Sequence, residues 1–197
     1  MKIGIHGKNG KMGQAITKCV GATYSFDECE IIIDVSHPSA LPGLIPIARK
    51  RKVPLVVGTT GFEDLSPLKN LSKELPLLYA PNFSLGILAT LKAALLIKEI
   101  INPKTLYIIE NHHLEKKDSP SGTALMLKNA LGASDIFSLR TPETIGTHTL
   151  LFSNEEEEIT LTHCSKSRML FAKGALIAAK KLMKKPPGFY ELSDLFK

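Results

Sequence analysis

Residues 110–124, which read ENHHLEKKDSPSGTA, bring two histidines, two lysines and a turn of small residues close together. His112 and His113 are adjacent, so in an extended segment their side chains point to opposite sides and cannot both face one ligand. A metal pair on a helix would need histidines spaced by three or four positions, with carboxylate or cysteine partners. The spacing therefore disfavours a metal site in this stretch.

The remaining chemistry of this stretch is anion binding and proton transfer. Lys116 and Lys117 can reach a carboxylate as flexible point charges. Pro120 opens a predicted helix whose first turn, Ser121 to Thr123, offers backbone N–H groups and hydroxyls to an anion. Together with a histidine that titrates near neutrality, these groups could serve a carboxylate substrate that needs proton transfer. A capped helix after a polar loop explains the same residues equally well.

A second candidate site is the glycine-rich segment GKNGKMG, residues 7–13, which joins a predicted strand at 2–6 to a predicted helix at 11–20. Without a Cβ at Gly7 and Gly10 the backbone can turn tightly, and its N–H groups can approach a pyrophosphate. Glycine at position 13 would let the helix lie close on the sheet. We favour dinucleotide binding over a ligand-free turn between strand and helix.

Further along, strands and helices are predicted to alternate, with strands at 30–35, 53–57 and 77–80 and helices at 41–52 and 66–74. This alternation is typical of a parallel sheet covered by helices. The loops GTTG at 58–61 and APNF at 80–83 follow two of these strands. Ligands bind outside the carboxyl ends of parallel strands, so the loops suggest an extended cofactor groove. Turn formation alone is the alternative.

After Ser84 the pattern changes to that of a separate α+β unit. We predict a helix at 85–101, a strand at 105–110, a helix at 124–131 and a hairpin of strands at 147–152 and 157–165. A helix from 169 to about 184 follows, and PPG at 186–188 separates it from a short tail.

Composition restricts the class of protein. The net charge of +6 includes lysines at 180, 181, 184 and 185, which suit the end of a helix. The sequence has no nucleic-acid-binding module, no signal peptide and no apolar run of roughly 18 residues, so we expect neither a nucleic-acid nor a membrane partner. Three scattered cysteines form no disulfide framework or metal spacing. We therefore expect a cytoplasmic protein without a structural metal.

The segment HHLEKKDSPSGTA, residues 112–124, resembles the signature of the 4-hydroxy-tetrahydrodipicolinate reductase (dihydrodipicolinate reductase) family, and departs from it only at Ser119, where alanine is usual. The other matches follow in family order along the chain: the glycine loop with KMG at 11–13, DVSHP at 34–38, GTTGF at 58–62, PNFS at 81–84, GTHT at 146–149 and SRMLFAKGA at 167–175.

This resemblance implies a Rossmann-like N-terminal domain with a reduced parallel sheet, residues 1–84 completed by 168–197. An α+β domain with a mixed or antiparallel sheet, residues 85–167, would bind substrate and form oligomer contacts; the family is usually homotetrameric. The implied reaction is reduction of a cyclic hydroxy-imine dicarboxylate by NADH or NADPH, with loss of water, in diaminopimelate and lysine biosynthesis.

The resemblance also assigns roles to residues. His112 would be the catalytic acid/base, and Lys116 the companion proton donor or carboxylate-binding cation. His113, Gly122 and Thr123 would hold the substrate carboxylates. The cofactor groove would be lined by residues of three loops: Gly7, Lys8, Asn9, Gly10, Lys11 and Met12; Gly58, Thr59 and Thr60; and Ala80, Pro81, Asn82 and Phe83.

Two segments are shorter than in the family. Only a short segment separates Val20 from Glu30, where most relatives have two further strands and the residue that reads the adenosine ribose. Asp34 lies 21 residues beyond Gly13, near the spacing of a ribose-binding carboxylate, but it aligns with a later turn of the family. The sequence therefore assigns no preference between NAD and NADP. The segment 135–144, which builds oligomer contacts in relatives, is also short.

Two other functions remain as alternatives. A catalytically idle nucleotide-binding scaffold could keep the fold, but the intact His112, Lys116 and Ser121 to Thr123 disfavour it. Another nicotinamide oxidoreductase acting on a different small acid would share the glycine loop but would have no reason to carry residues 112–124.

Overall fold

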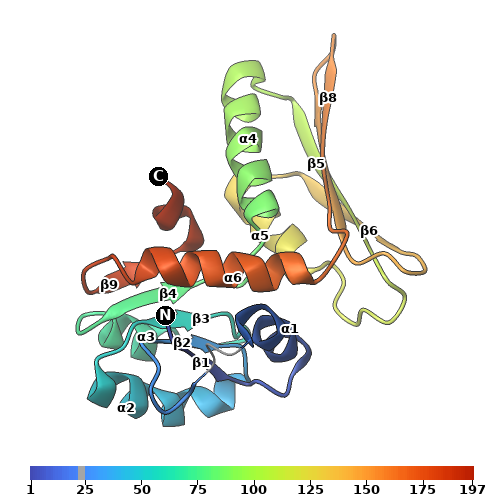
Figure 1. Cartoon of the computed structure of the whole chain (residues 1–197). Coiled ribbons are helices and arrows are strands. Elements are labelled where there is room, and N and C mark those ends of the chain that lie inside the picture. The colour runs from blue at the N-terminus through green and yellow to red at the C-terminus, as the bar shows by residue number, and fades with distance from the viewer. Residues whose placement is uncertain (22–24) are drawn as a thin grey trace. The chain divides into compact units, whose positions relative to one another are not determined.

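The structure, a computed structural model, describes residues 1–21 and 25–197 and divides into two units (Figure 1). Unit 1 comprises Met1–Phe83 and Met169–Lys197, and unit 2 comprises Ser84–Arg168. No helix within the described ranges is long and apolar enough to cross a membrane.

Unit 1 is built on a five-stranded parallel sheet. Its strands lie in the order β1 (Ile3–His6), β2 (Ile31–Asp34), β3 (Leu55–Val57), β4 (Pro76–Tyr79) and β9 (Gly188–Tyr190). Strands β2 and β3 are buried along their whole length. Their continuous apolar runs are what a parallel sheet covered on both faces requires.

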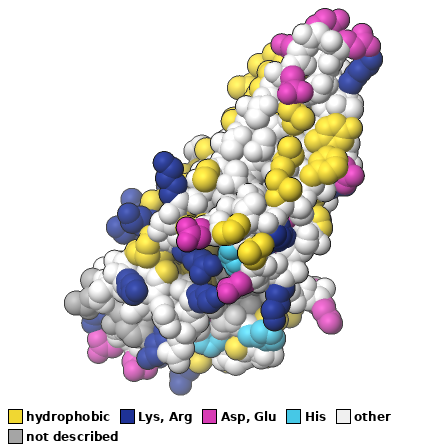
Figure 2. All heavy atoms as spheres, turned by 90° about the vertical axis from the view of Figure 1, so that its right-hand side faces the viewer, with side chains coloured by type: hydrophobic (Ala, Val, Ile, Leu, Met, Phe, Trp, Pro, Cys, Tyr) yellow, Lys and Arg dark blue, Asp and Glu magenta, His cyan; other side chains and the backbone are white. Residues whose placement is uncertain are grey.

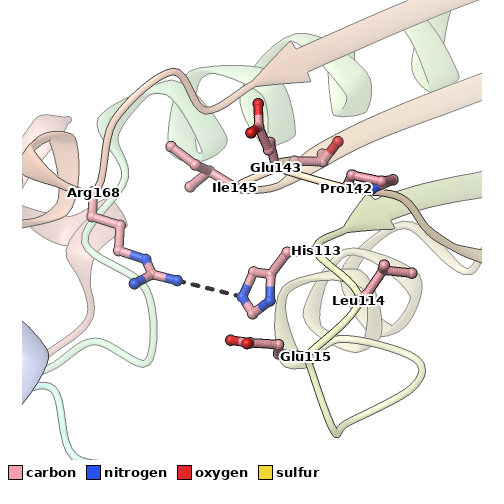
Figure 3. A pocket seen from close by; sticks show the side chains of 8 residues that line it. His113, Leu114, Glu115, Pro142, Glu143, Ile145 and Arg168 are labelled. Carbon is pink, nitrogen blue, oxygen red and sulfur yellow. Dashed lines mark hydrogen bonds between the residues drawn. The ribbon is translucent and has the colours of Figure 1, made fainter.

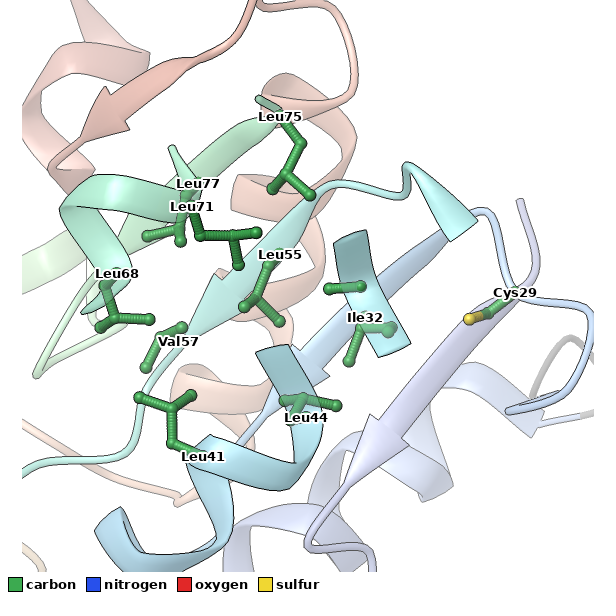
Figure 4. Close-up of a cluster of buried hydrophobic side chains, with 11 residues drawn as sticks. Cys29, Ile32, Leu41, Leu44, Leu55, Val57, Leu68, Leu71, Leu75 and Leu77 are labelled. Carbon is green, nitrogen blue, oxygen red and sulfur yellow. The ribbon is translucent and has the colours of Figure 1, made fainter. Parts of the chain in front are cut away.

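Helices α2 (Leu41–Arg51) and α3 (Ser66–Leu71) cover one face of this sheet. Their leucines form a buried cluster with Ile32, Leu55 and Val57 (Figure 4). Helix α2 forms although Pro46 lies inside it. The short 3₁₀ helix η2 (Pro38–Ala40) precedes α2.

Helix α6 (Met169–Leu182) contacts β2, β3 and β4, and packs against α1 (Lys11–Val20). The side of α6 that is buried consists largely of small residues: Ala172, Gly174, Ala175, Ala178 and Ala179. A Cβ on Gly174 would overlap the carbonyl oxygen of Phe83, so this glycine lets α6 approach the end of the first segment of unit 1.

The end of the chain differs from the prediction. Residues 186–197 were expected to be a tail, but β9 pairs with β4 as the fifth strand and the 3₁₀ helix η3 (Leu192–Phe196) packs on α6. The prolines at 186 and 187 correctly marked the end of α6, and the strand of three residues that follows is too short to show a period.

Unit 2 contains a four-stranded mixed sheet in the order β6-β5-β7-β8. Strand β5 (Thr105–His112) pairs in parallel with β6 (Asp135–Arg140) and antiparallel with β7 (Thr147–Ser153), which pairs with β8 (Glu158–Cys164). Helices α4 (Leu85–Ile101) and α5 (Gly122–Leu131) pack on one face of this sheet. The parallel sheet of unit 1 and the mixed sheet of unit 2 confirm the predicted fold class.

Strand β6 was not predicted. It occupies most of the segment 135–144 and follows α5 as the second strand of a β–α–β crossover. Helix α5 begins at Gly122, within the first turn predicted at Ser121 to Thr123 and ahead of the range 124–131, because the Ser121 side chain caps it by accepting a hydrogen bond from the Ala124 N–H at 3.2 Å.

Candidate active site

His112 is the last residue of β5, and its side chain lies on the same face of the sheet as that of Glu110, two positions earlier. Glu110 is completely buried, and its Oε2 hydrogen-bonds Nδ1 of His112. The second oxygen, Oε1, accepts from Arg140 Nη1 at 3.0 Å and from the Ser121 N–H at 3.3 Å. The histidine is therefore held by a carboxylate that is itself anchored on β6 and on α5.

Opposing effects set the pKa values of this pair. Burial alone would raise the pKa of Glu110, but the side chains of Ser138, Arg140 and His112 outweigh it and the pKa is lowered. For His112, burial lowers the pKa, and the cations of Lys116 and Arg140 lower it further, against the opposing effect of Glu110. The resting pair is thus an ionised Glu110 and a neutral His112 at neutral pH.

Lys116 lies in the turn that follows β5. Its Nζ donates to both carboxylate oxygens of Asp118, at 2.7 and 2.8 Å. The carbonyl of Asp118 accepts from Arg140 Nη2 at 2.7 Å. Arg140 therefore ties this turn to Glu110, and the two predicted catalytic residues share one arginine as an anchor.

A second histidine, His148 on β7, packs edge-on against the ring of His112 with 5.2 Å between ring centroids. Its Nε2 lies 3.2 Å from Ser121 Oγ. Burial, and then the proximity of His112, lowers the pKa of His148 to about 4. His148 is therefore neutral at physiological pH.

His113 points away from this cluster and lines a pocket of about 360 Å³ in unit 2 (Figure 3). Arg168 Nη2 lies 3.4 Å from His113 Nε2 across this pocket. The remaining lining residues are Leu114, Glu115, Pro142, Glu143, Thr144 and Ile145. Gly122 and Thr123, the other predicted substrate-binding residues, lie instead in the first turn of α5 beside Ser121.

In unit 1 the glycine loop joins β1 to α1. Gly7 has a φ of +84°, and a Cβ there would lie 2.6 Å from the carbonyl oxygen of Val35. A Cβ on Gly13 would lie 2.6 Å from Lys8 Cα, so Gly13 brings α1 close to the loop. Gly10 is the N-cap residue of α1 and offers no capping side chain. A tight glycine loop at an uncapped helix N-terminus is what a pyrophosphate requires.

Asp34, at the end of β2, connects the carboxyl ends of three neighbouring strands. Its Oδ1 accepts from Ser36 Oγ at 2.6 Å and hydrogen-bonds His6 Nδ1 at 2.8 Å. Its Oδ2 accepts from Thr59 Oγ1 at 2.7 Å, and this hydroxyl in turn accepts the N–H of Ser36 at 2.9 Å. Both oxygens of Asp34 therefore hold protein groups, which supports its exclusion as a ribose-binding residue.

The predicted cofactor residues lie in loops at the carboxyl edge of the same sheet. Thr60 follows β3, and Ala80, Pro81 and Asn82 follow β4. Lys8, Asn9, Lys11 and Met12 belong to the glycine loop and the start of α1. Phe83 is buried, and its ring occupies the space that a Cβ on Gly58 would need. The ring therefore packs against the loop after β3 and does not extend into solvent.

Sequence reasoning missed Glu110, Arg140 and His148. Glu110 could have been found, because residues two apart on a strand share a face and a carboxylate there can hold His112. Arg140 and His148 reach His112 only through the pairing of β5 with β6 and β7, which the sequence does not display.

Comparison with known proteins places these two units in one family. Family models described as the N-terminus and the C-terminus of dihydrodipicolinate reductase match residues 22–83 and 86–196. A 4-hydroxy-tetrahydrodipicolinate reductase of Thermosipho africanus is 39% identical over 213 residues, covering 100% of this chain and 98% of the relative. One of Campylobacter lari is 35% identical over 237 residues, covering 98% of each.

The alignment of 237 residues exceeds the 197 residues of the chain, so this chain lacks positions that the Campylobacter relative has. A solved structure, dipicolinate-bound dihydrodipicolinate reductase from Paenisporosarcina sp. TG-14, shares the fold with a TM-score of 0.82, at 23% identity over 96% of both chains. Matches to both family models, together with relatives above 30% identity over nearly the whole length, show that the chain is a shortened member of the dihydrodipicolinate reductase family.

Proposed function

We propose that this chain is a cytoplasmic, NAD(P)H-dependent oxidoreductase that reduces 4-hydroxy-tetrahydrodipicolinate to tetrahydrodipicolinate, with loss of water, in diaminopimelate and lysine biosynthesis. The observation that carries the proposal is the buried pair of His112 and Glu110, next to Lys116 and Arg140, in a unit whose sequence matches the family. A proton-transfer group held beside cations suits a dicarboxylate substrate.

Each unit would have its own role: unit 1 would bind the nucleotide, and unit 2 would bind the substrate. In unit 1 the backbone N–H groups at the start of α1 would hold the pyrophosphate, and the loops after β3 and β4 would hold the rest of the nicotinamide half. The bound nicotinamide supplies the hydride. In unit 2, Lys116, His113, Arg168 and the first turn of α5 would bind carboxylates, while His112 transfers the proton that balances the hydride.

The test is oxidation of NADH or NADPH that depends on the dicarboxylate substrate. We expect His112→Ala and Lys116→Ala to lower kcat/KM by about 10²- to 10⁴-fold, the usual contribution of general acid–base catalysis. Lys117→Ala is the matched control, because this neighbouring lysine is exposed and should change the rate little. Wild-type protein that binds nucleotide but turns over no faster than these variants would support the idle scaffold instead.

The nucleotide half can be tested separately by titrating NADH and NADPH and following nicotinamide fluorescence. We expect Gly7→Ala to weaken the binding of both, because its Cβ would meet the Val35 backbone and its φ is positive. Gly43→Ala is the control, since a Cβ there meets no atom within 4 Å. Equal nucleotide affinity in wild type and Gly7→Ala would show that the glycine loop holds no nucleotide.

We also propose that the chain forms a homo-oligomer through the outer face of the unit 2 sheet. Helices α4 and α5 pack on one face of this sheet, and the outer face is the opposite one. On β6, Phe137 and Leu139 are 52% and 51% exposed, and Tyr107, Ile109 and Leu151 are only half-buried on the neighbouring strands. Figure 2 shows apolar side chains gathered where this sheet faces the viewer. A second copy offers the same apolar residues and would cover this face by two-fold symmetry.

Light scattering after size exclusion tests this interface. We expect the double variant Phe137→Glu and Leu139→Glu to shift the mass from oligomer to monomer. Leu96→Glu is the matched control, because Leu96 is 57% exposed on α4, away from this face. A monomeric wild type, or dissociation by Leu96→Glu alone, would refute the assignment.

A further inference from the structure

His112 has one close neighbour at each of its ring nitrogens. Glu110 bonds Nδ1, as described above. At the other side, a Cβ built on Gly146 would lie 2.9 Å from Nε2 and 3.2 Å from Cδ2. Gly146 precedes β7, and its carbonyl oxygen accepts the N–H of Ser165 at 2.8 Å, which fixes the glycine in this place.

Glu110 determines which nitrogen carries the proton of neutral His112. An ionised carboxylate can only accept hydrogen bonds, so Nδ1 must donate and Nε2 must keep its lone pair. The carboxylate has no competing orientation, because its other oxygen is bonded to Arg140 and to the Ser121 N–H. This arrangement resembles in its logic the carboxylate that orients a catalytic histidine in hydrolases.

Gly146 determines whether anything can reach Nε2. Its φ lies outside the left-handed region, so the backbone allows alanine, and the effect of the substitution would come from the contact of its Cβ with the His112 ring. A Cβ at 2.9 Å from Nε2 and 3.2 Å from Cδ2 would lie against the ring beside Nε2, where it would crowd the approach of a reacting atom to this nitrogen.

We propose that Glu110 is a positioning residue that holds the proton of His112 on Nδ1, and that Gly146 keeps Nε2 open as the nitrogen that exchanges a proton with the substrate. This inference rests on the proposed reductase function, and it assigns the tautomer of His112 to Glu110 and the access to its second nitrogen to Gly146.

The charges around His112 predict how a loss of Glu110 changes the pH dependence. The ring is faced by Glu110 on β5, by Lys116 in the following turn, by Arg140 on β6 and by the neutral His148 on β7. The carboxylate of Glu110 favours the protonated ring, whereas both cations oppose it. Glu110→Gln should therefore lower the pKa of His112, so that an activity needing the imidazolium is lost at a lower pH than in wild type.

The first experiment compares wild type with Glu110→Gln by steady-state kinetics over pH and by ¹⁵N NMR of histidine-labelled protein. We expect kcat to fall by about 10²-fold or more with little change in KM, as when a histidine loses its orienting carboxylate. The alkaline limb of the kcat profile should move to lower pH. Wild-type His112 should show the Nδ1–H tautomer and the variant a mixture, because a glutamine amide can also donate to Nδ1.

The second experiment uses Gly146→Ala, which should lower kcat by at least about tenfold and leave the His112 tautomer unchanged. Gly86→Ala is the matched control, since a Cβ there would also meet a histidine Nε2, that of His163, in the same unit. It should leave the pH profile and the tautomer of His112 as they are.

Several results would overturn the inference. A folded Glu110→Gln with the wild-type pH limb and tautomer would make Glu110 merely structural, and a Gly146→Ala with wild-type kcat would remove the role of Nε2. If Glu110→Gln does not fold, wild-type spectra still decide, because an Nε2–H tautomer contradicts the proposal. A wild type without turnover but with the Nδ1–H tautomer would count against the reductase function and not against the Glu110 assignment.

Discussion

Each unit contains a histidine bonded through Nδ1 to a completely buried carboxylate, but the two pairs differ in their surroundings. Asp34 receives hydroxyl groups and His6 from three strand ends, and the His6 side chain is 27% exposed. Glu110 receives a guanidinium, a backbone N–H and His112, whose side chain is 10% exposed. The His6–Asp34 pair connects the ends of neighbouring strands, whereas the His112–Glu110 pair holds a titratable ring among charged groups. The same type of contact therefore has a structural role in unit 1 and a proposed chemical role in unit 2.

The largest expected effect comes from the second histidine beside the unit 2 pair. With a pKa of about 4 in the folded protein and 6.5 in the unfolded chain, His148 binds a proton only on unfolding between these values. Its contribution to stability is therefore present above pH 6.5 and lost as pH falls towards 4, a total of about 3 kcal/mol. Chemical denaturation across this range should show a shallower pH dependence in His148→Gln. Parallel curves for the two proteins would contradict the assignment.

The comparison predicts that Asp34→Asn costs stability but does not change the chemistry of unit 2. One amide N–H₂ would face donors that now meet a carboxylate, which costs about 2 kcal/mol of unfolding free energy. Urea denaturation measures this loss, and the kcat profile over pH should keep its alkaline limb. If Asp34→Asn moved that limb as far as Glu110→Gln does, the two pairs would not be functionally distinct.

The smallest expected effect concerns one donor to Asp34. Thr59→Val removes the hydroxyl that donates to Asp34 and accepts from Ser36, and should lower the unfolding free energy by about 1 kcal/mol. Thr59→Ser keeps the hydroxyl and should stay close to wild type. Equal melting temperatures for the valine and serine variants would show that this hydroxyl does not hold the strand ends together.

The sequence predicted those features of the fold that depend on local pattern. Helices α1 and α4 begin and end at the predicted residues, because a glycine or serine cap and apolar periodicity mark both. Strand β6 escaped prediction because its apolar residues, Phe137 and Leu139, face outward on an open sheet and carry no sign of burial. Strand β9 escaped because three residues after two prolines show no period.

The candidate site shows the same division. His112 and Lys116 were identifiable because they lie within one short stretch with Ser121. Arg140 and His148 come from strands that meet β5 only by sheet pairing, and Gly146 matters only through its distance to the His112 ring. Such partners depend on register, which a single sequence does not specify. The assigned roles of the cofactor and substrate residues remain predictions.

The position of β1 at the margin of its sheet has a consequence for solubility. An edge strand such as β1 presents backbone groups that can pair with a strand of another molecule and seed aggregation. In this chain the segment before β2 shields that margin: the Ser25 N–H donates to the Ile3 carbonyl at 3.1 Å, and the Phe26 ring lies against Gly4. Residues 25 and 26 thus cover part of the free edge of β1, which leaves less of this strand open to pairing with another molecule.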